Sequence, residues 1–207
     1  MVLSSAIILA GGSSTRLGQD KGLLKLGNKP LAKHVIDAVD GLVDEKILVV
    51  SSNTQARCYT GHIFSNIRVV IDKWGLQSPL VGALTGFQSA QNDYSILLSC
   101  DIPFLSRDIL SFLLDLSLNK SAVVPRWPNG YIEPLQAVYC TKLARIASEN
   151  ALQKGALNML AMIDRLQRIR YVSTLLLRQL DSELATFFNV NTLLDLKKAE
   201  AMQKRGK

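Results

Sequence analysis

The sequence predicts an α/β fold in which a mainly parallel sheet is covered by helices on both faces. Short apolar, β-branched runs such as Ala6-Ile7-Ile8-Leu9 are typical of strands that are buried on both faces. These runs alternate along the chain with helical segments, which is the pattern of a parallel sheet. A length of 207 residues suits one such unit, and we predict that residues 1–207 form a single domain.

The individual elements follow from the same signals. We expect strands at residues 6–9, 46–51, 67–71, 95–100, 121–124, 135–139 and 169–172. We expect helices at residues 31–39, 79–90, 107–116, 143–150, 156–166 and 192–203. Pro79 suits the first turn of a helix, and Ser106 and Thr192 are expected N-cap residues. Since ligands of parallel sheets bind beyond the carboxyl ends of the strands, we expect the site in the loops that follow strands.

The composition restricts the possible classes of function. A formal net charge of +7 favours anionic ligands such as a nucleotide or a phosphorylated cofactor. The sparse aromatic residues are not interleaved with basic ones, which argues against a nucleic-acid-binding protein. Cys58, Cys100 and Cys140 are too scattered for a disulfide framework or a zinc site, which favours a reducing, cytoplasmic location. No apolar stretch is long enough to span a membrane, so we expect no membrane partner.

The segment after the first strand has the composition of a polyphosphate-binding loop. Gly11 and Gly12 let the backbone turn, Ser13 supplies a donor, and Arg16 and Lys21 supply positive charge. The spacing matches neither a Walker A loop nor the GxGxxG fingerprint. The alternative is an ordinary strand-to-helix turn with solvated charges. An arginine and a lysine within one short loop favour phosphate binding instead.

Polar residues also follow other predicted strands. Asp101 comes directly after the run SILLSC, and Mg²⁺ binds through one or two carboxylates together with substrate phosphates. Asn189 and Asn191 share one face of a short extended segment and could join Asp101 around a metal or contact the nucleotide. Asn53 and Asp72 follow two further strands and could reach a ligand. For each of these residues, a turn or a helix cap is the structural alternative.

Several segments together resemble motifs of the molybdenum cofactor guanylyltransferases, the MobA-like nucleotidyltransferases. LAGGSSTRLGQDKGLLKL resembles the opening motif of that family, with Leu17 where methionine is usual. LLSCDIPFL resembles the family's metal motif, FFNVNTLLDL its late asparagine segment, and EPLQAVY its acceptor-side segment. The motifs follow in the family's order over nearly the whole chain. The resemblance implies a Rossmann-like three-layer sandwich of the nucleotidyltransferase type.

The resemblance also implies a reaction. GMP would pass from GTP to the terminal phosphate of molybdopterin, and pyrophosphate would leave. Asp101 would hold Mg²⁺ with Asn191 as a second contact, and Arg16, Lys21 and Asp101 would be the catalytic residues. The implied nucleotide-binding residues are Leu9, Ala10, Gly11, Gly12, Ser13, Lys21, Asn53, Asp72, Gly82 and Asp101. Transient contact with molybdoenzymes or their chaperones would follow from such a role.

Other functions stay open on the sequence alone. Ser78-Pro79-Leu80-Val81-Gly82 stands where the family usually has Gly-Pro-Leu-Ala-Gly near the guanine. Related enzymes use CTP with molybdopterin, or GTP with adenosylcobinamide phosphate, and both reactions are alternatives. A non-catalytic nucleotide-binding module is a third. The combination of Arg16, Lys21 and Asp101 argues against it, because a pure binding protein needs no metal-centred cluster of charges.

Overall fold

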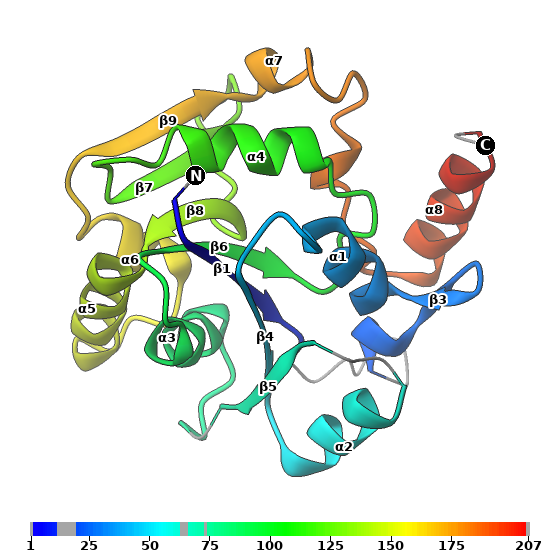
Figure 1. Ribbon diagram of the computed structural model, residues 1–207, viewed down its shortest axis with the longest axis horizontal. Coiled ribbons are helices and arrows are strands. Elements are labelled where there is room, and N and C mark those ends of the chain that lie inside the picture. The colour runs from blue at the N-terminus through cyan, green and yellow to red at the C-terminus, as the bar shows by residue number, and fades with distance from the viewer. Residues whose placement is uncertain (1, 12–19, 63–65, 73, 206–207) are drawn as a thin grey trace.

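A seven-stranded sheet forms the middle layer of the molecule, with the strand order β5-β4-β1-β6-β8-β7-β9 (Figure 1). The computed structural model describes residues 2–11, 20–62, 66–72 and 74–205. Helices cover both faces of the sheet, with α3, α5 and α6 on one face and α1 and α4 on the other (Figure 1). The predicted α/β sandwich with a mainly parallel sheet is confirmed.

The bounds of the elements are as follows. The strands are β1 Ser4–Leu9, β2 Lys25–Leu26, β3 Lys29–Pro30, β4 Glu45–Val50, β5 Arg68–Ile71, β6 Tyr94–Ser99, β7 Ala122–Arg126, β8 Gln136–Cys140 and β9 Ile169–Ser173. The α-helices are α1 Leu31–Val39, α2 Asn53–His62, α3 Pro79–Ser89, α4 Arg107–Asp115, α5 Thr141–Gln153, α6 Met159–Ile163, α7 Thr174–Leu177 and α8 Leu193–Arg205. Two 3₁₀ helices are η1 Lys21–Leu23 and η2 Ala185–Phe187.

The strand β1 lies at the centre of the parallel part of the sheet. It pairs in parallel with β4, where Ile7 is opposite Ile47, and with β6, where Ile7 is opposite Leu97. All six of its residues are buried, as a continuous apolar run predicts for a strand covered on both faces. The carboxyl ends of β1, β4, β5 and β6 therefore lie along one edge of the sheet.

The strand β8 is antiparallel to both of its neighbours, β6 and β7. Its position in the sequence was predicted, but the apolar run gave no direction. The direction follows from the connection, because β7 ends at Arg126 and β8 begins at Gln136. A link this short can form a hairpin, whereas a parallel pair needs a crossover of a dozen or more residues.

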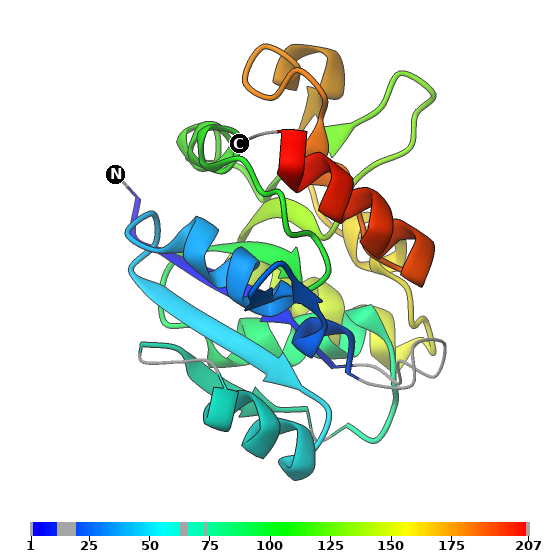
Figure 2. The ribbon, with the colours of Figure 1, turned by 90° about the vertical axis from the view of Figure 1, so that its right-hand side faces the viewer.

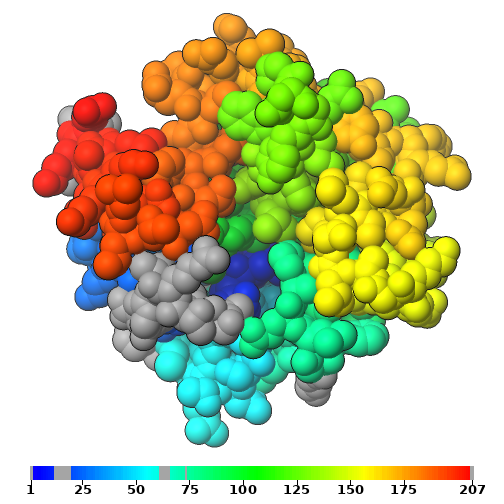
Figure 3. Space-filling view, turned by 180° about the vertical axis from the view of Figure 1, so that it is seen from behind, coloured from blue at the N-terminus to red at the C-terminus, as the bar shows by residue number. Residues whose placement is uncertain are grey.

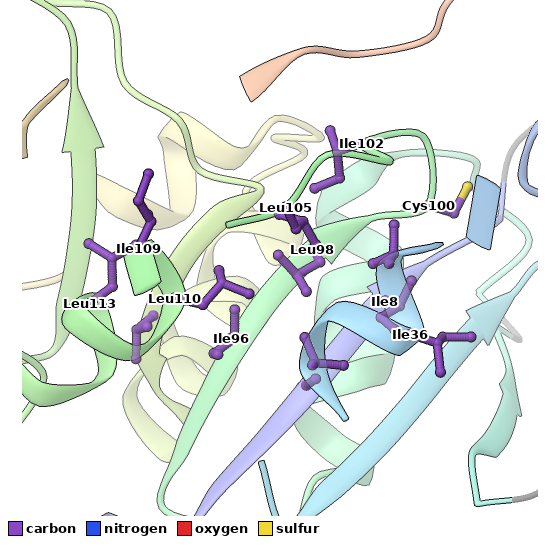
Figure 4. Close-up of a cluster of buried hydrophobic side chains, with 14 of the residues drawn as sticks. Ile8, Ile36, Ile96, Leu98, Cys100, Ile102, Leu105, Ile109, Leu110 and Leu113 are labelled. Atoms are coloured by element: carbon purple, nitrogen blue, oxygen red, sulfur yellow. The ribbon is translucent and has the colours of Figure 1, made fainter. Parts of the chain in front are cut away.

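Two apolar cores lie on the two faces of the sheet. Figure 4 shows part of one of them, where Ile8 of β1 and Leu98 of β6 lie among side chains such as Ile36 of α1 and Leu110 of α4. The core on the opposite face is formed with α3, α5 and α6. The two cores hold the strand ends in place.

The predicted helix caps on the two sides of the sheet are confirmed. Pro79 is the first residue of α3, and the Ser78 hydroxyl before it accepts a hydrogen bond from the amide of Val81 at 3.2 Å. The Ser106 hydroxyl accepts from the amide of Ile109 at 3.3 Å and caps α4. These caps satisfy amides that have no partner within the helix.

Helix α2 was not predicted from the sequence. Its residues, NTQARCYTGH, are largely polar and carry no apolar stripe, so the helical period that reveals an amphipathic helix is absent. Two predicted helices differ from the observed ones by three residues at one or both ends. The helix expected at 143–150 is the longer α5. The helix expected at 156–166 is the shorter α6, which begins after the N-cap Asn158.

A third, smaller apolar cluster lies beside the sheet. Its buried members are Leu24, Leu26, Leu31, Val190 and Ala199. The cluster joins the β2–β3 hairpin, which turns at Gly27 with a φ of 64°, to the segment before α8 and to α8 itself. Figure 2 shows α8 lying outside the layers of the sandwich. Residues 24–31 are thereby packed against residues 190–199.

The helices of the described chain are short or polar in relation to the apolar thickness of a membrane. Within the part of the chain that the structure describes, no helix combines the length and the apolar character that crossing a bilayer requires.

Two glycines of α3 face β1 and differ in the space around them. A Cβ added at Gly86 would lie 2.2 Å from Ile7 Cγ2, whereas one added at Gly82 would lie 3.4 Å from Leu9 Cδ2. The first distance is far below van der Waals contact and the second is an ordinary contact. Helix α3 therefore approaches β1 most closely at Gly86.

We expect Gly86→Ala to lower the free energy of unfolding by about 1–3 kcal/mol, because the new methyl group must displace Ile7 within a close-packed core. Gly82→Ala is the matched control on the same helix. It should raise the free energy of unfolding by up to about 1 kcal/mol, because alanine is the better helix former. Urea unfolding measures both values, and equal effects of the two substitutions would contradict this packing of α3 on β1.

Candidate functional site

Three segments that are far apart in the sequence meet at the ammonium group of Lys21. Its Nζ lies 2.7 Å from Asp101 Oδ2 and donates to Asn191 Oδ1 at 2.6 Å. Lys21 follows β1, Asp101 follows β6, and Asn191 precedes α8. Two oxygen atoms from different elements thus point at one cationic group, at the carboxyl edge of the sheet where the sequence predicts the site.

Asp101 is held firmly at the end of β6. Its side chain is only 8% exposed, and the Ser99 hydroxyl donates to its Oδ1. Its main-chain carbonyl accepts a hydrogen bond from the amide of Val190 at 2.9 Å. The charged contact with Lys21 compensates part of the cost of burying this carboxylate. The contact with Val190 also brings the late asparagine segment next to the strand end.

Asn191 is oriented by the start of the last helix. Val190 is fully buried in the third cluster, so by alternation its neighbours point the other way, as the sequence predicts. The Asp195 carboxylate accepts from the amides of Asn191 at 3.2 Å and Thr192 at 2.9 Å, and the Thr192 hydroxyl accepts from the Asp195 amide at 3.1 Å. Thr192 is therefore the N-cap that was expected. The hydrogen bond from the Thr192 hydroxyl, followed by those from the two amides, lowers the pKa of Asp195.

The two asparagines of this segment differ in their partners. The Asn189 amide nitrogen donates to the nearby carbonyl of Phe187 at 3.2 Å, whereas Asn191 contacts Lys21. The sequence predicts both on one face, and within the described part of the chain Asn191 is the one of the two that contacts a charged group of the site.

Lys21 opens the 3₁₀ helix η1, and its side chain is 22% exposed. The preceding residue, Asp20, caps this helix by accepting from the amide of Gly22 at 3.0 Å. Tyr59 and Gln55 of α2 also donate to the Asp20 carboxylate. Sequence reasoning missed Asp20, Gln55 and Tyr59 as parts of the site. No pattern in the sequence pointed to Gln55 or Tyr59, since α2 itself was not predicted.

The remaining candidates for nucleotide binding lie at the same edge. Leu9 ends β1, and Ala10 donates to the Val49 carbonyl at 2.8 Å. A Cβ at Gly11 would lie 3.3 Å from the amide nitrogen of Ser51. This edge is therefore formed where the ends of β1 and β4 approach each other.

Asn53, Asp72 and Gly82 surround the other side of this edge. Asn53 is the exposed first residue of α2, and Gly82 packs against β1 from α3. Asp72 accepts from the amide of Trp74 at 3.0 Å and from the Thr85 hydroxyl at 3.4 Å, so it forms the turn that the sequence allowed as its alternative role. The predicted residues Gly12, Ser13 and Arg16 lie outside the described residues.

The pair formed by Asp101 and Asn191 suits one hard divalent cation in its donor chemistry. Both residues already direct an oxygen at a single cationic group, and carboxylate and amide oxygens are ligands of Mg²⁺. Among the described residues no group of three or more His, Cys, Asp or Glu side chains could hold a metal. A metal at this pair would therefore complete its coordination with substrate phosphates and water, and the Lys21 ammonium would have to move aside.

Atoms of the first strand are visible in a hollow on the face of the molecule seen from behind (Figure 3). In the space-filling view the blue atoms of the first strand lie recessed between the teal atoms around the start of α3 and the lime atoms of the segment after β7 (Figure 3). The lime segment contains Trp127 and Glu133, whose side chains form a hydrogen bond of 2.7 Å from Nε1 to Oε1. Burial raises the pKa of Glu133 above its ordinary value of 4.5.

The family of the chain follows from its similarity to known proteins. Residues 6–169 match the model of the MobA-like NTP transferase domain. The chain belongs to this family. It is a nucleotidyltransferase, as the resemblance of the sequence motifs indicated. Enzymes of this MobA-like family generally use a divalent metal.

Several relatives of this MobA-like nucleotidyltransferase are similar over nearly their whole length. A probable molybdenum cofactor guanylyltransferase of Methanosarcina mazei is 32% identical over 197 residues, which are 93% of this chain and 88% of the relative. A molybdenum cofactor guanylyltransferase of Desulfosudis oleivorans is 32% identical over 205 residues, covering 98% of this chain and 97% of the relative. The late asparagine segment, beyond residue 169, is thus included in these similarities.

The fold is also similar to those of solved structures. The crystal structure of molybdopterin-guanine dinucleotide biosynthesis protein A from Archaeoglobus fulgidus superposes with a TM-score of 0.83 at 25% identity, covering 97% of this chain and 99% of that chain. A nucleotidyl transferase of Methanothermobacter thermautotrophicus has a TM-score of 0.74 at 19% identity over 99% of both chains and shares the fold.

The raised pKa of Glu133 gives a prediction for stability against pH. Between pH 4.5 and the raised pKa, the folded state binds more protons than the unfolded state, so stability falls as the pH rises through this window. Glu133→Gln keeps an acceptor for Trp127 and removes the titration. The free energy of unfolding of the wild-type protein should therefore fall relative to that of the variant as the pH rises above about 4.5. Urea unfolding at several pH values measures this difference, and parallel curves would contradict the burial of this carboxyl.

Proposed function

We propose that this chain transfers GMP from GTP to the terminal phosphate of molybdopterin, with release of pyrophosphate. The observation that supports this most directly is the contact of Lys21 with both Asp101 and Asn191 at the carboxyl edge of the sheet. The similar proteins named as molybdenum cofactor guanylyltransferases support the choice of substrates.

The proposed reaction joins two anions, and their repulsion is the main obstacle. An oxygen of the acceptor phosphate attacks the α-phosphorus of GTP, a new P–O bond forms, and the bond to the bridging oxygen of the leaving pyrophosphate breaks. Lys21 lies where its positive charge can offset this repulsion and hold the phosphates in line. Arg16 is proposed to act in the same way. Because the nucleophile is already an anion, no residue has to remove a proton from it.

We propose Mg²⁺ as the divalent metal, held by Asp101 and Asn191. When bound, Mg²⁺ supplies positive charge to the phosphate oxygens at the reacting centre. In its absence the Lys21 ammonium keeps the two protein oxygens directed at one point. Asp101 can hold a cation at a defined position, because Ser99 bonds its carboxylate and Val190 bonds its main-chain carbonyl.

The nucleotide is proposed to lie along the carboxyl ends of β1, β4, β5 and β6. Its phosphates would contact Leu9, Ala10 and the loop that contains Gly11, Gly12, Ser13, Arg16 and Lys21. The nucleoside would approach Asn53, Asp72 and Gly82. We further propose that residues 1–207 act as one catalytic unit in the cytoplasm, with transient contacts to molybdoenzymes or their chaperones. The meeting of Lys21 and Asn191 from opposite ends of the chain supports a single unit.

The test is to incubate the protein with Mg²⁺, molybdopterin and either GTP or CTP, and to identify the dinucleotide and the pyrophosphate formed. We expect the guanine dinucleotide. Formation of the cytosine dinucleotide alone would overturn the choice of base, for which Ser78-Pro79-Leu80-Val81-Gly82 is the segment that differs from the usual pattern. A parallel incubation replaces molybdopterin with adenosylcobinamide phosphate, and turnover with that acceptor alone would overturn the choice of acceptor.

Asp101→Asn and Lys21→Met should each lower kcat by roughly 100-fold or more. The first removes the carboxylate proposed to hold Mg²⁺, and the second removes positive charge that offsets the repulsion between the phosphates. Both substitutions nearly keep the side-chain volume, so circular dichroism should show the fold intact. Asp37→Asn is the control, since Asp37 also forms an ion pair with a lysine, at 2.9 Å from Lys29, but on α1 away from the site. Its turnover should equal that of the wild-type protein. Normal turnover of either site variant would exclude the role proposed for that residue.

A further inference from the structure

One side chain of α2 is bonded to both ends of the segment that links β1 to Lys21. The Gln55 amide nitrogen donates to the Ala10 carbonyl at 2.7 Å and to the Asp20 carboxylate. Its amide oxygen accepts from the Ser51 amide at 2.7 Å and from the Ser51 hydroxyl at 3.0 Å. All four hydrogen-bonding positions of the Gln55 side chain are therefore used. They tie the end of β1, the end of β4 and Asp20 to a single amide group.

Tyr59 lies one helical turn further along α2 and holds the other oxygen of the same carboxylate. Its hydroxyl donates to Asp20 Oδ1 at 2.6 Å, and the amide of Gly22 donates to that oxygen at 3.0 Å. The Tyr59 side chain is fully buried. Burial, with the nearby Cys100 and Asp20, raises the pKa of Tyr59 well above its ordinary value, so its hydroxyl stays a donor over the physiological range of pH.

The Tyr59 side chain also lies very close to the backbone of Gly22, the residue that follows Lys21. A Cβ at Gly22 would lie 2.1 Å from Tyr59 Oη, so only a glycine leaves room for the ring at this position. Lys21 thus lies between two residues that α2 holds in place. Tyr59 holds Asp20 through its carboxylate. The Gly22 amide donates to that same carboxylate, and Gly22 also lies against the Tyr59 hydroxyl. The backbone of Lys21 has little freedom, although the lysine side chain itself is long and flexible.

We propose that Gln55 and Tyr59 are positioning residues, which fix the Asp20 carboxylate and so hold the backbone of Lys21 at the carboxyl edge of the sheet, within reach of the proposed reacting phosphates. They touch no reacting atom. They act by holding Asp20 in place relative to the end of β1, through the hydrogen bonds of Gln55 to Ala10 and Asp20. This inference rests on the proposed function insofar as Lys21 serves catalysis.

The first test compares two substitutions that each remove one hydroxyl. Tyr59→Phe breaks the contact with Asp20. Tyr94→Phe is the control, because Tyr94 begins β6 at the opposite edge of the sheet, where its hydroxyl accepts from the Asn119 amide at 3.1 Å. We expect Tyr59→Phe to lower kcat by about 10- to 100-fold at saturating GTP, because misplacing a charged group by a fraction of an ångström weakens catalysis strongly. Tyr94→Phe should keep the wild-type kcat.

The second test measures the positioning itself, on the protein without substrates. The amides of Leu23 and Leu24 donate to the carbonyls of Asp20 and Lys21, both at 3.1 Å, and report on η1. Hydrogen exchange of a peptide that spans residues 20–26 should be at least about threefold faster in Tyr59→Phe than in the wild-type protein or in Tyr94→Phe, because local opening becomes easier. Unchanged exchange, or faster exchange with a normal kcat, would overturn the proposal.

A double-variant cycle separates positioning from a general loss of stability. Asp20→Asn and Tyr59→Phe act through one contact, so the double variant should lose no more kcat than the more damaging single substitution loses. Losses that multiply would show that Tyr59 does not act through Asp20 and would overturn the proposal. If the wild-type protein forms no dinucleotide at all, the proposed function fails, while the exchange experiment still decides whether α2 holds the backbone around Lys21.

Discussion

The contact between the Lys21 ammonium and the Asp101 carboxylate is the constraint on which the rest of the site depends. It is 2.7 Å long and joins the segment after β1 to the end of β6. These two strands are neighbours in the sheet, so their carboxyl ends lie side by side before any side chain is considered. The sheet thus brings the two charges together, and the local contacts of Asp20 and Ser99 only adjust their directions.

The third member of the site depends on packing outside the sheet. Asn191 reaches Lys21 because Val190 is buried in the small cluster with Leu24 and Leu26, and because the Val190 amide donates to the carbonyl of Asp101. The β2–β3 hairpin and α8 therefore serve the site indirectly. They anchor the late asparagine segment, and apolar burial supplies the driving force for that anchoring.

The elements that depend on apolar pattern could be predicted from the sequence, and those that depend on polar contacts could not. The run before Asp101 revealed a buried strand and therefore placed the carboxylate at the site. Alternation around Val190 likewise predicted the direction of Asn191. Helix α2 carries no such pattern, because what it contributes near the site is Gln55 and Tyr59, bonded to a residue more than thirty positions earlier. A pairing of this kind leaves no local periodicity that could be read.

The order of the site residues along the chain has a consequence for the enzyme during its synthesis. Lys21 and Asp101 emerge from the ribosome well before Asn191, which lies just ahead of the last helix. A nascent chain can assemble β1, β4, β5 and β6 while Asn191 and its supporting helix are still inside the exit tunnel. The three side chains therefore cannot meet until Asn191 and the helix that follows it have left the tunnel, and a polypeptide shorter than this lacks a complete catalytic centre.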